Sequence, residues 1–343
     1  MFTVFTEKNV FENVVICNDD LPNWYNIFCN HAEVYLNISK EEYLEELKEG
    51  TAIFEYIKAN AGREPIPLAY HFQSIYDDPS RVLDKPRAVY LLNYSDAEAK
   101  SLQNKFGVII QGENNIDDNI LRNTYSKNLP QNSVWITGTK LGWNSLLNIS
   151  LPPLNTIVIS DNFLFTNEDG NRGTANFLQF IESILPDHLE IDFHILLLAQ
   201  QPALKDKLWC ERKVGQLKTE LKNLNKSYPI NFELVFAETI HKRIAISNYF
   251  ILIAEKGFAI FKTNDLKTVH DDNDIVLDRI FNRANKNEGD TQFIISDYSL
   301  SSIKRNCKSV AEYISNRSND DNFRILGDCN KDKSINNRLI NDV

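Results

Sequence analysis

Strand and helix signals alternate along most of this chain, and this alternation constrains the fold more than any other feature of the sequence. The clearest case is the stretch 87–112, where the β-like run RAVYLLN, the helix-like segment SDAEAKSLQNKFG and a second β-like run, VIIQG, follow one another. A strand, a helix and a strand in this order form a βαβ unit, whose two strands run parallel in one sheet. The sequence therefore predicts an α/β fold that contains parallel strands.

The alternation loosens once, between about residue 124 and residue 153, where KNLPQNS and ISLPPLN surround the β-like run VWITG. Pro152-Pro153 gives the best domain boundary. We therefore expect an α/β domain over residues 1–150 and a second α/β domain over 151–313. The segment 314–343 is rich in Asn and Asp and has little apolar surface to offset the entropy of ordering, so we expect a flexible tail.

Within the first domain, ENVVICN and AEVYLNI have the composition of short strands. The segment that follows them, 39–62, is predicted to form one amphipathic helix. Ser39 is its expected N-cap, with Glu42 three residues later, and Gly62 is its expected end.

Composition limits the functions that the chain can have. With 343 residues, 43% of them hydrophobic, the chain can bury a large core and is long enough for two domains. Its 37 Lys and Arg against 47 Asp and Glu give a net charge of −10, which repels polyanions at long range, so any contact with nucleic acid must be local. No segment approaches the roughly 20 apolar residues of a membrane helix, and we expect a cytoplasmic protein. The five cysteines never occur as CxxC, which argues against a zinc knuckle.

The most informative short motif stands just before a long apolar run. His241 is followed two residues later by Arg243, four more residues lead to Asn248, and the next apolar strand ends at Gly257-Phe258. This order, after a strand that itself follows an amphipathic helix, resembles one half of the phospholipase D-like phosphodiesterase fold, whose motif is His-x-Lys-x4-Asp between two strands. The histidine and the spacing match, whereas Arg243 replaces the lysine and Asn248 replaces the aspartate.

The resemblance covers roughly residues 155–262 and implies a phospholipase D-like mixed sheet in the second domain. It implies that His241 attacks phosphorus, while Arg243 and Lys242 bind the phosphoryl oxygens. Arginine keeps the phosphate-binding charge, but Asn248 lacks the carboxylate, so we expect phosphate to be bound better than it is hydrolysed, without a metal or another cofactor. No other histidine precedes a Lys or Arg by two residues, so a homodimer that apposes two copies of His241 would complete the site.

A basic stretch in the second domain is the best candidate for contact with a nucleic-acid backbone, because it interleaves cations with an aromatic residue. It contains Lys205, Lys207, Trp209, Arg212 and Lys213. A solvated helix face explains the same pattern equally well.

Other interpretations stay open. The His-Lys-Arg triplet is also typical of a solvated strand end, with Arg243 extended towards water. The segment NEDGNRGT precedes a helix whose N-terminus could hold an anion beside Arg172, or it is an ordinary loop. The chain could also be a non-catalytic subunit of a larger assembly.

An acidic cluster in the first domain offers a further alternative, a metal-dependent nuclease. Its members would be Asp19 and Asp20 together with Glu33 or Asp96. Adjacent acids more often lie in a solvated turn.

Overall fold

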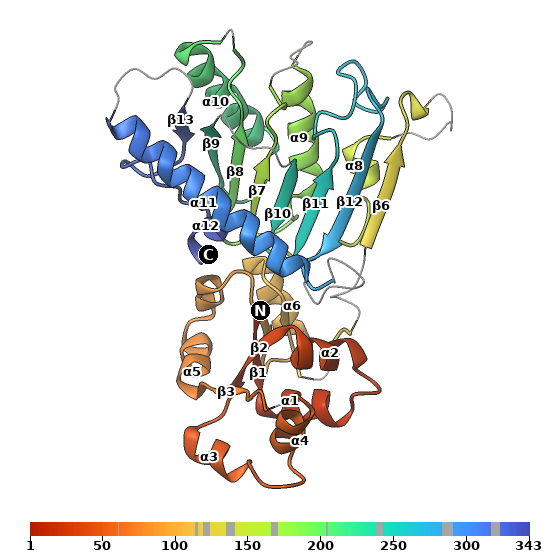
Figure 1. Ribbon diagram of the computed structural model, residues 1–343, viewed down its shortest axis with the longest axis vertical. Coiled ribbons are helices and arrows are strands. Elements are labelled where there is room, and N and C mark those ends of the chain that lie inside the picture. The colour runs from red at the N-terminus through yellow and green to blue at the C-terminus, as the bar shows by residue number, and fades with distance from the viewer. Residues whose placement is uncertain are drawn as a thin grey trace. The chain divides into compact units, whose positions relative to one another are not determined.

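A computed structural model describes the chain over residues 1–60, 62–113, 116–118, 124–134, 141–165, 171–203, 205–237, 243–282, 291–316 and 323–343 (Figure 1). The chain divides into two units, each with its own sheet, and this confirms the predicted two-part α/β architecture. The first unit comprises 1–123, 279–295 and 342, and the second comprises 124–278, 296–341 and 343. The second unit begins before the expected boundary at Pro152-Pro153, because β6 (Thr124–Leu129) pairs with β12 (Asn273–Arg279).

The first unit contains a five-stranded sheet in the order β3-β2-β1-β4-β5, with all neighbouring strands parallel. Its strands are β1 (Phe2–Glu7), β2 (Ala32–Asn37), β3 (Ile66–Pro67), β4 (Val89–Leu91) and β5 (Ile110–Gln111). Its helices are α1 (Lys8–Ile16), α2 (Pro22–Asn30), α3 (Lys40–Glu45), α4 (Ala52–Ala59), α5 (Ala69–Asp77), the 3-10 helix η1 (Pro79–Asp84) and α6 (Asp96–Phe106). The βαβ unit expected over 87–112 is β4-α6-β5, in which Ser95 and Glu98 form a capping box.

Two local predictions in this unit were wrong. The run ENVVICN lies mostly in helix α1, and the first strand is instead β1, because a short apolar run fits a buried helix as well as a strand. The single helix expected over 39–62 is two helices, α3 and α4. Ser39 caps α3 as expected, but Gly50 has a φ of 91°, and Thr51 then caps α4 by accepting a bond from the amide of Phe54.

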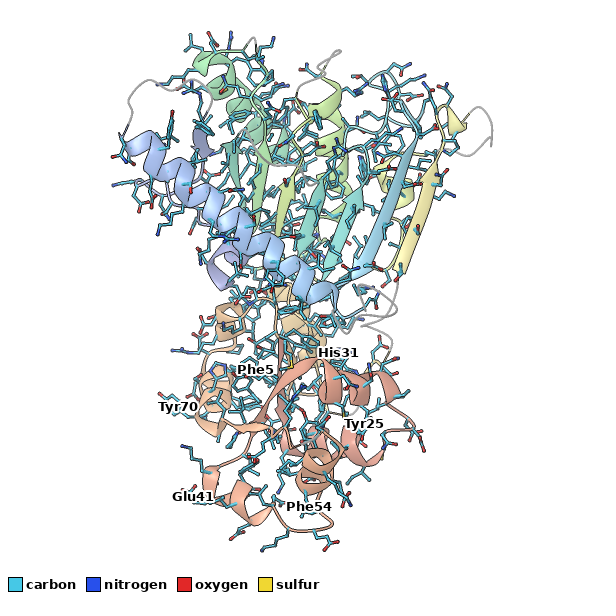
Figure 2. All side chains as sticks on the ribbon, viewed as in Figure 1. Phe5, Tyr25, His31, Glu41, Phe54 and Tyr70 are labelled. Carbon is cyan, nitrogen blue, oxygen red and sulfur yellow. The ribbon has the colours of Figure 1, made fainter. Side chains whose placement is uncertain are left out.

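The core of the first unit is aromatic on one face of the sheet. Phe5 projects from β1 and stacks on Tyr90 of β4, with ring centroids 5.0 Å apart, and it contacts the ring of Phe72 from α5 edge-on. Tyr70, two residues before Phe72 on the same helix, is 88% exposed, so α5 buries one face and presents the other to solvent (Figure 2).

The second unit contains an eight-stranded mixed sheet in the order β13-β9-β8-β7-β10-β11-β12-β6. Besides β6 and β12, its strands are β7 (Thr156–Ser160), β8 (Phe193–Ala199), β9 (Ile230–Phe236), β10 (Ile244–Ser247), β11 (Phe250–Ala254) and β13 (Arg324–Gly327). β7, β8 and β9 run parallel, whereas β10 runs antiparallel to β7. The parallel strands are connected by α9 (Arg172–Ile184) and α10 (Lys207–Lys222), as the alternating signals predicted.

Helices cover both faces of this sheet. Figure 1 shows α9 and α10 on one face and the long helix α11 (Gln292–Asn316) crossing the other. The short helix α8 (Trp143–Leu146) joins α9 in the larger hydrophobic core. Among the described helices, none is long and apolar enough to cross a membrane.

The C-terminal segment is ordered where it is described, contrary to the flexible tail expected over 314–343. It forms β13 and α12 (Arg338–Asp342), and Asn337 between them is fully buried. The Asn337 amide donates to the carbonyl of Ile157 at 3.3 Å, and Arg338 forms an ion pair with Asp192. Polar side chains therefore fix this segment through specific bonds, which its composition alone does not reveal.

Candidate anion-binding site

Arg243, the cation of the His-x-Arg motif, lies immediately before β10, at the point where β7 ends. Ile244 pairs with Ser160 in the antiparallel register, so Arg243 and Asp161 are the next opposed residues beyond this pair. The guanidinium of Arg243 lies 4.7 Å from the centre of the Phe163 ring, and its Nη1 donates to the carbonyl of Glu255. Its Nε is buried and has no hydrogen-bond partner in the described part of the chain. His241 and Lys242 lie outside the described residues.

Asp161 is a buried carboxylate at the carboxyl end of β7. It is 1% exposed, and it accepts hydrogen bonds from the backbone amides of Phe258 at 2.7 Å and Phe163 at 3.0 Å. Burial raises the pKa of Asp161, while these two bonds and the charge of Arg243 oppose that rise. A Cβ at Gly257 would lie 2.7 Å from the carboxylate, and Gly257 has a φ of +93°, so only glycine suits this turn.

A small polar cavity of about 70 Å³ opens beside Asp161. We call it the Arg172 cavity; its lining residues are Asp161, Phe163, Arg172, Lys256, Ala259, Ile260, Asp271 and Asn273. These residues come from separate parts of the sequence, and the sheet and the turn after β11 bring them together. The cavity therefore lies where the end of β7, the start of α9 and the turn after β11 converge.

Arg172 is the first residue of α9 and is only 7% exposed, yet its Nε has no hydrogen-bond partner among the described residues. Asn171, the N-cap, makes no side-chain bond to the helix; its Oδ1 instead accepts from Lys213 at 3.3 Å. A Cβ at Gly173 would overlap with the carbonyl of Leu164, so glycine lets the segment after β7 cross the first turn of α9 closely. A buried unpaired guanidinium donor is costly, and an anion would satisfy it.

The lining of the Arg172 cavity carries two cations and two carboxylates. Arg172 and Lys256 line it, and Arg243 contacts one lining residue and interacts electrostatically with another. The carboxylates are Asp161, which already accepts two backbone bonds, and Asp271, which is paired with His270 at 2.6 Å.

Asn248, the other described member of the motif, does not join this site. It lies in the turn between β10 and β11, so the four residues of β10 separate it from Arg243, a span of roughly 17 Å in extended chain. Asn248 is fully buried; its Oδ1 accepts the backbone amide of Asn155 at 3.0 Å, and its Nδ2 donates to the Asn155 side chain at 3.2 Å. The contacts of Asn248 are those of a buried residue that joins two strands.

The basic stretch of α10 divides between two faces of the helix. Lys205, Lys207 and Arg212 are exposed. Trp209 packs against the rings of Phe165 and Phe236, and Lys213 is 4% exposed with its Nζ 3.1 Å from Thr174 Oγ1. The five residues do not share one surface.

A larger groove of about 390 Å³ lies near the end of α10, and its lining includes Lys218, Lys222 and Lys226. Two of these cations are already engaged. Lys218 pairs with Asp328 at 2.5 Å, and Lys226 donates to the carbonyls of Leu185 and Pro186. Two of the three lysines at this groove therefore already bond to other residues of the chain.

The acidic alternative in the first unit finds no geometric support. Glu33 lies at the start of β2 and Asp96 follows the end of β4, so the two lie at opposite ends of the parallel strands. Asp19 and Asp20 are exposed in the loop between α1 and α2. Within the described ranges, no group of three His, Cys, Asp or Glu side chains could hold a metal ion.

A different carboxylate, Glu7, lies at the carboxyl end of β1 in this sheet. It is 8% exposed, and it accepts bonds from Asn37 at 2.8 Å and from the hydroxyl of Tyr76. Burial raises its pKa, and the two bonds oppose the rise. Both carboxylate oxygens have partners inside the unit, so Glu7 is part of a satisfied network.

The motif search identified Arg243, and the helix-start pattern identified Arg172, but sequence reasoning missed Asp161, Phe163 and Lys256. A carboxylate directly after the buried strand TIVIS was the available signal for Asp161, because the carboxyl ends of parallel strands commonly carry binding sites. Nothing in the local sequence marks Phe163 or Lys256.

Comparisons with known proteins add little to this picture. No protein-family model and no curated protein matches the chain. A solved structure of TrmBL2, an archaeal chromatin protein described as binding DNA, is similar over 46% of this chain and 47% of its own, with 11% identity and a TM-score of 0.21. The match spans about half of that protein's length.

Proposed function

We propose that the second unit binds the phosphate groups of a nucleotide or nucleic acid, with one phosphoryl group seated in the Arg172 cavity. The observation that carries this proposal is the Nε of Arg172, a buried donor without a hydrogen-bond partner in the described chain, at the wall of a polar cavity. A phosphoryl group supplies the acceptor oxygens that a guanidinium binds best. Lys256 and Arg243 add positive charge beside it.

The size of the cavity supports a single phosphoryl group. Its volume of about 70 Å³ exceeds the space of roughly 10–15 Å³ that one water needs. It is far below the roughly 300–1,000 Å³ of pockets that enclose a whole organic ligand. The remainder of a nucleotide would therefore stay outside the cavity.

Hydrolysis by His241 remains a prediction that rests on the phospholipase D-like resemblance. Asn248, which replaces the motif's aspartate, is held by Asn155 at the far end of β10, which favours binding without efficient turnover. The expected homodimer belongs to the same prediction, because a single chain supplies one such histidine.

Calorimetric titration of the full chain with inorganic phosphate and pyrophosphate tests the binding proposal. Arg172→Ala removes the guanidinium that lines the cavity and should weaken binding roughly ten- to hundredfold, the effect of losing a charge-assisted hydrogen bond. Arg243→Ala removes a positive charge next to the lining and should weaken binding less. Lys267→Ala, which removes an exposed lysine outside the cavity, should leave affinity unchanged. Thermal melting checks that the variants fold, and Arg172→Lys, which keeps the charge, should retain part of the affinity. Equal affinity for wild type and Arg172→Ala would overturn the proposal.

Turnover is tested separately with labelled DNA and RNA strands in the presence of a chelator. We expect slow cleavage or none, and any cleavage that does occur should be lost in His241→Ala, since the predicted chemistry needs no metal. Cleavage that requires a divalent metal and survives His241→Ala would contradict the assignment of His241.

A further inference from the structure

Phe163 is an exposed aromatic side chain at the edge of the Arg172 cavity. It is 45% exposed, although most large apolar side chains of the described residues are buried. Its backbone amide donates to Asp161 at 3.0 Å, which fixes the segment that carries the ring. The guanidinium of Arg243 lies against this ring, 4.7 Å from its centre, so the ring is already in contact with a flat cationic group.

The position of this ring bears on what the rest of the ligand is. If a phosphoryl group fills a cavity of about 70 Å³, the sugar and base attached to it must lie at the rim. Phe163 is the aromatic member of the lining, and at 45% exposed it is also open to solvent. Nucleobases stack on aromatic side chains whatever their sequence, because every base has a π-face.

We propose that Phe163 is a stacking platform for an unpaired nucleobase, an inference that rests on the proposed phosphate site. The ligand class is then a nucleotide or a single strand rather than a duplex, since the bases of a duplex are paired and stacked on one another. The net charge of −10 fits this, because a site that combines one phosphate with one base depends less on long-range attraction than a surface that follows a duplex backbone.

Fluorescence anisotropy with labelled oligonucleotides tests the inference in the full chain. The probes are a single strand, its duplex, and a strand of equal length whose sites are abasic. Wild type should bind the single strand more tightly than the duplex or the abasic strand. Phe163→Leu, which keeps an apolar side chain without the π-face, should bind the single strand roughly tenfold more weakly. Its affinity for inorganic phosphate, which has no base to stack, should fall much less than its affinity for the single strand, since Phe163 also lines the cavity and contacts Arg243.

Two controls keep the test decisive. Phe163→Trp should retain single-strand binding, which shows that a ring is what matters at this position, and Tyr70→Leu removes an aromatic residue that is 88% exposed in the first unit and should have no effect. Equal single-strand affinity in Phe163→Leu and wild type, or equal wild-type affinity for single strand and abasic strand, would overturn the stacking role and leave phosphate binding intact. If the wild-type protein did not bind inorganic phosphate at all, that result would instead contradict the proposed function.

Discussion

Replacing Asn248 with aspartate restores the carboxylate of the phospholipase D-like motif, and the structure predicts that this change will destabilise the protein instead of activating it. Asn248 is fully buried and exchanges two hydrogen bonds with Asn155. An aspartate keeps the acceptor for the Asn155 amide, but it replaces the Nδ2 donor with a second oxygen that faces the Asn155 side-chain oxygen. The change therefore removes a donor and buries a charge.

The size of the stability loss is set by whichever of two states of the buried carboxyl costs less free energy. The carboxylate either stays charged, with a burial cost of several kcal/mol, or takes up a proton. Protonation at pH 7 of a group with an ordinary pKa of about 3.9 costs about 4 kcal/mol, at about 1.4 kcal/mol for each pH unit. We therefore expect Asn248→Asp to lose about 3–4 kcal/mol of unfolding free energy at pH 7.

The loss should depend on pH with a definite sign. The protonated form of the new carboxyl is the one that folds best, so its folded pKa is raised above its unfolded value, and the folded variant binds more protons. Its stability should therefore recover as pH falls from 7 towards 4, where the protonated carboxyl can donate to Asn155. Urea unfolding at pH 7 and pH 4.5 measures this, with Asn264→Asp, at an exposed loop position, as the matched control. An Asn248→Asp variant as stable as wild type at pH 7 would show that this buried position tolerates a carboxylate.

Three further changes test other parts of the structure. Gly173→Ala should lower stability and weaken phosphate binding, because the new Cβ overlaps with the Leu164 carbonyl, and unchanged urea midpoints would contradict this. Gly215→Ala, in the middle of α10 with no atom within 4 Å of the new Cβ, should raise stability by about 0.5–1 kcal/mol; a loss would show an unrecognised contact. Burial raises the pKa of Glu233 from 4.5 to about 7, so the folded protein holds a proton that the unfolded chain has already lost. The free energy of unfolding of the wild type should therefore fall by up to roughly 3 kcal/mol as pH rises from 4.5 to 7. In urea unfolding across pH 4.5–8, Glu233→Gln should not show this fall. If the unfolding free energies of the two proteins changed in parallel with pH, Glu233 would not be the group responsible.

The sequence predicted the elements of this fold better than their boundaries. The β4-α6-β5 unit was readable because a capping box and a glycine mark the helix ends, and β8 was readable as an apolar run interrupted only by His194. The run ENVVICN was misassigned because a short apolar run fits a buried strand and one face of a helix equally well. The C-terminal segment was misjudged because its order depends on asparagine and arginine side chains that bond to distant strands.

The candidate site was predictable only in the parts that lie close together in the chain. Arg243 was found because its spacing from His241 follows a known motif. Its neighbours Asp161 and Phe163 lie far upstream and meet it only through the β7-β10 register. Lys256 lies downstream and joins Asp161 and Phe163 in the cavity lining only through the turn after β11. The burial of Asn248 was also beyond the sequence, because its partner Asn155 lies just before another strand.

The binding of a phosphoryl group beside Arg172 can be observed by locating a phosphate analogue in the protein. Crystals of the full chain soaked in tungstate, an oxyanion whose metal gives a strong anomalous signal, would show where a tetrahedral anion binds. We expect an anomalous peak in the Arg172 cavity, within hydrogen-bonding distance of the Arg172 Nε, and no such peak in Arg172→Ala. A peak only in the groove of Lys218, Lys222 and Lys226, or no peak at all, would contradict it.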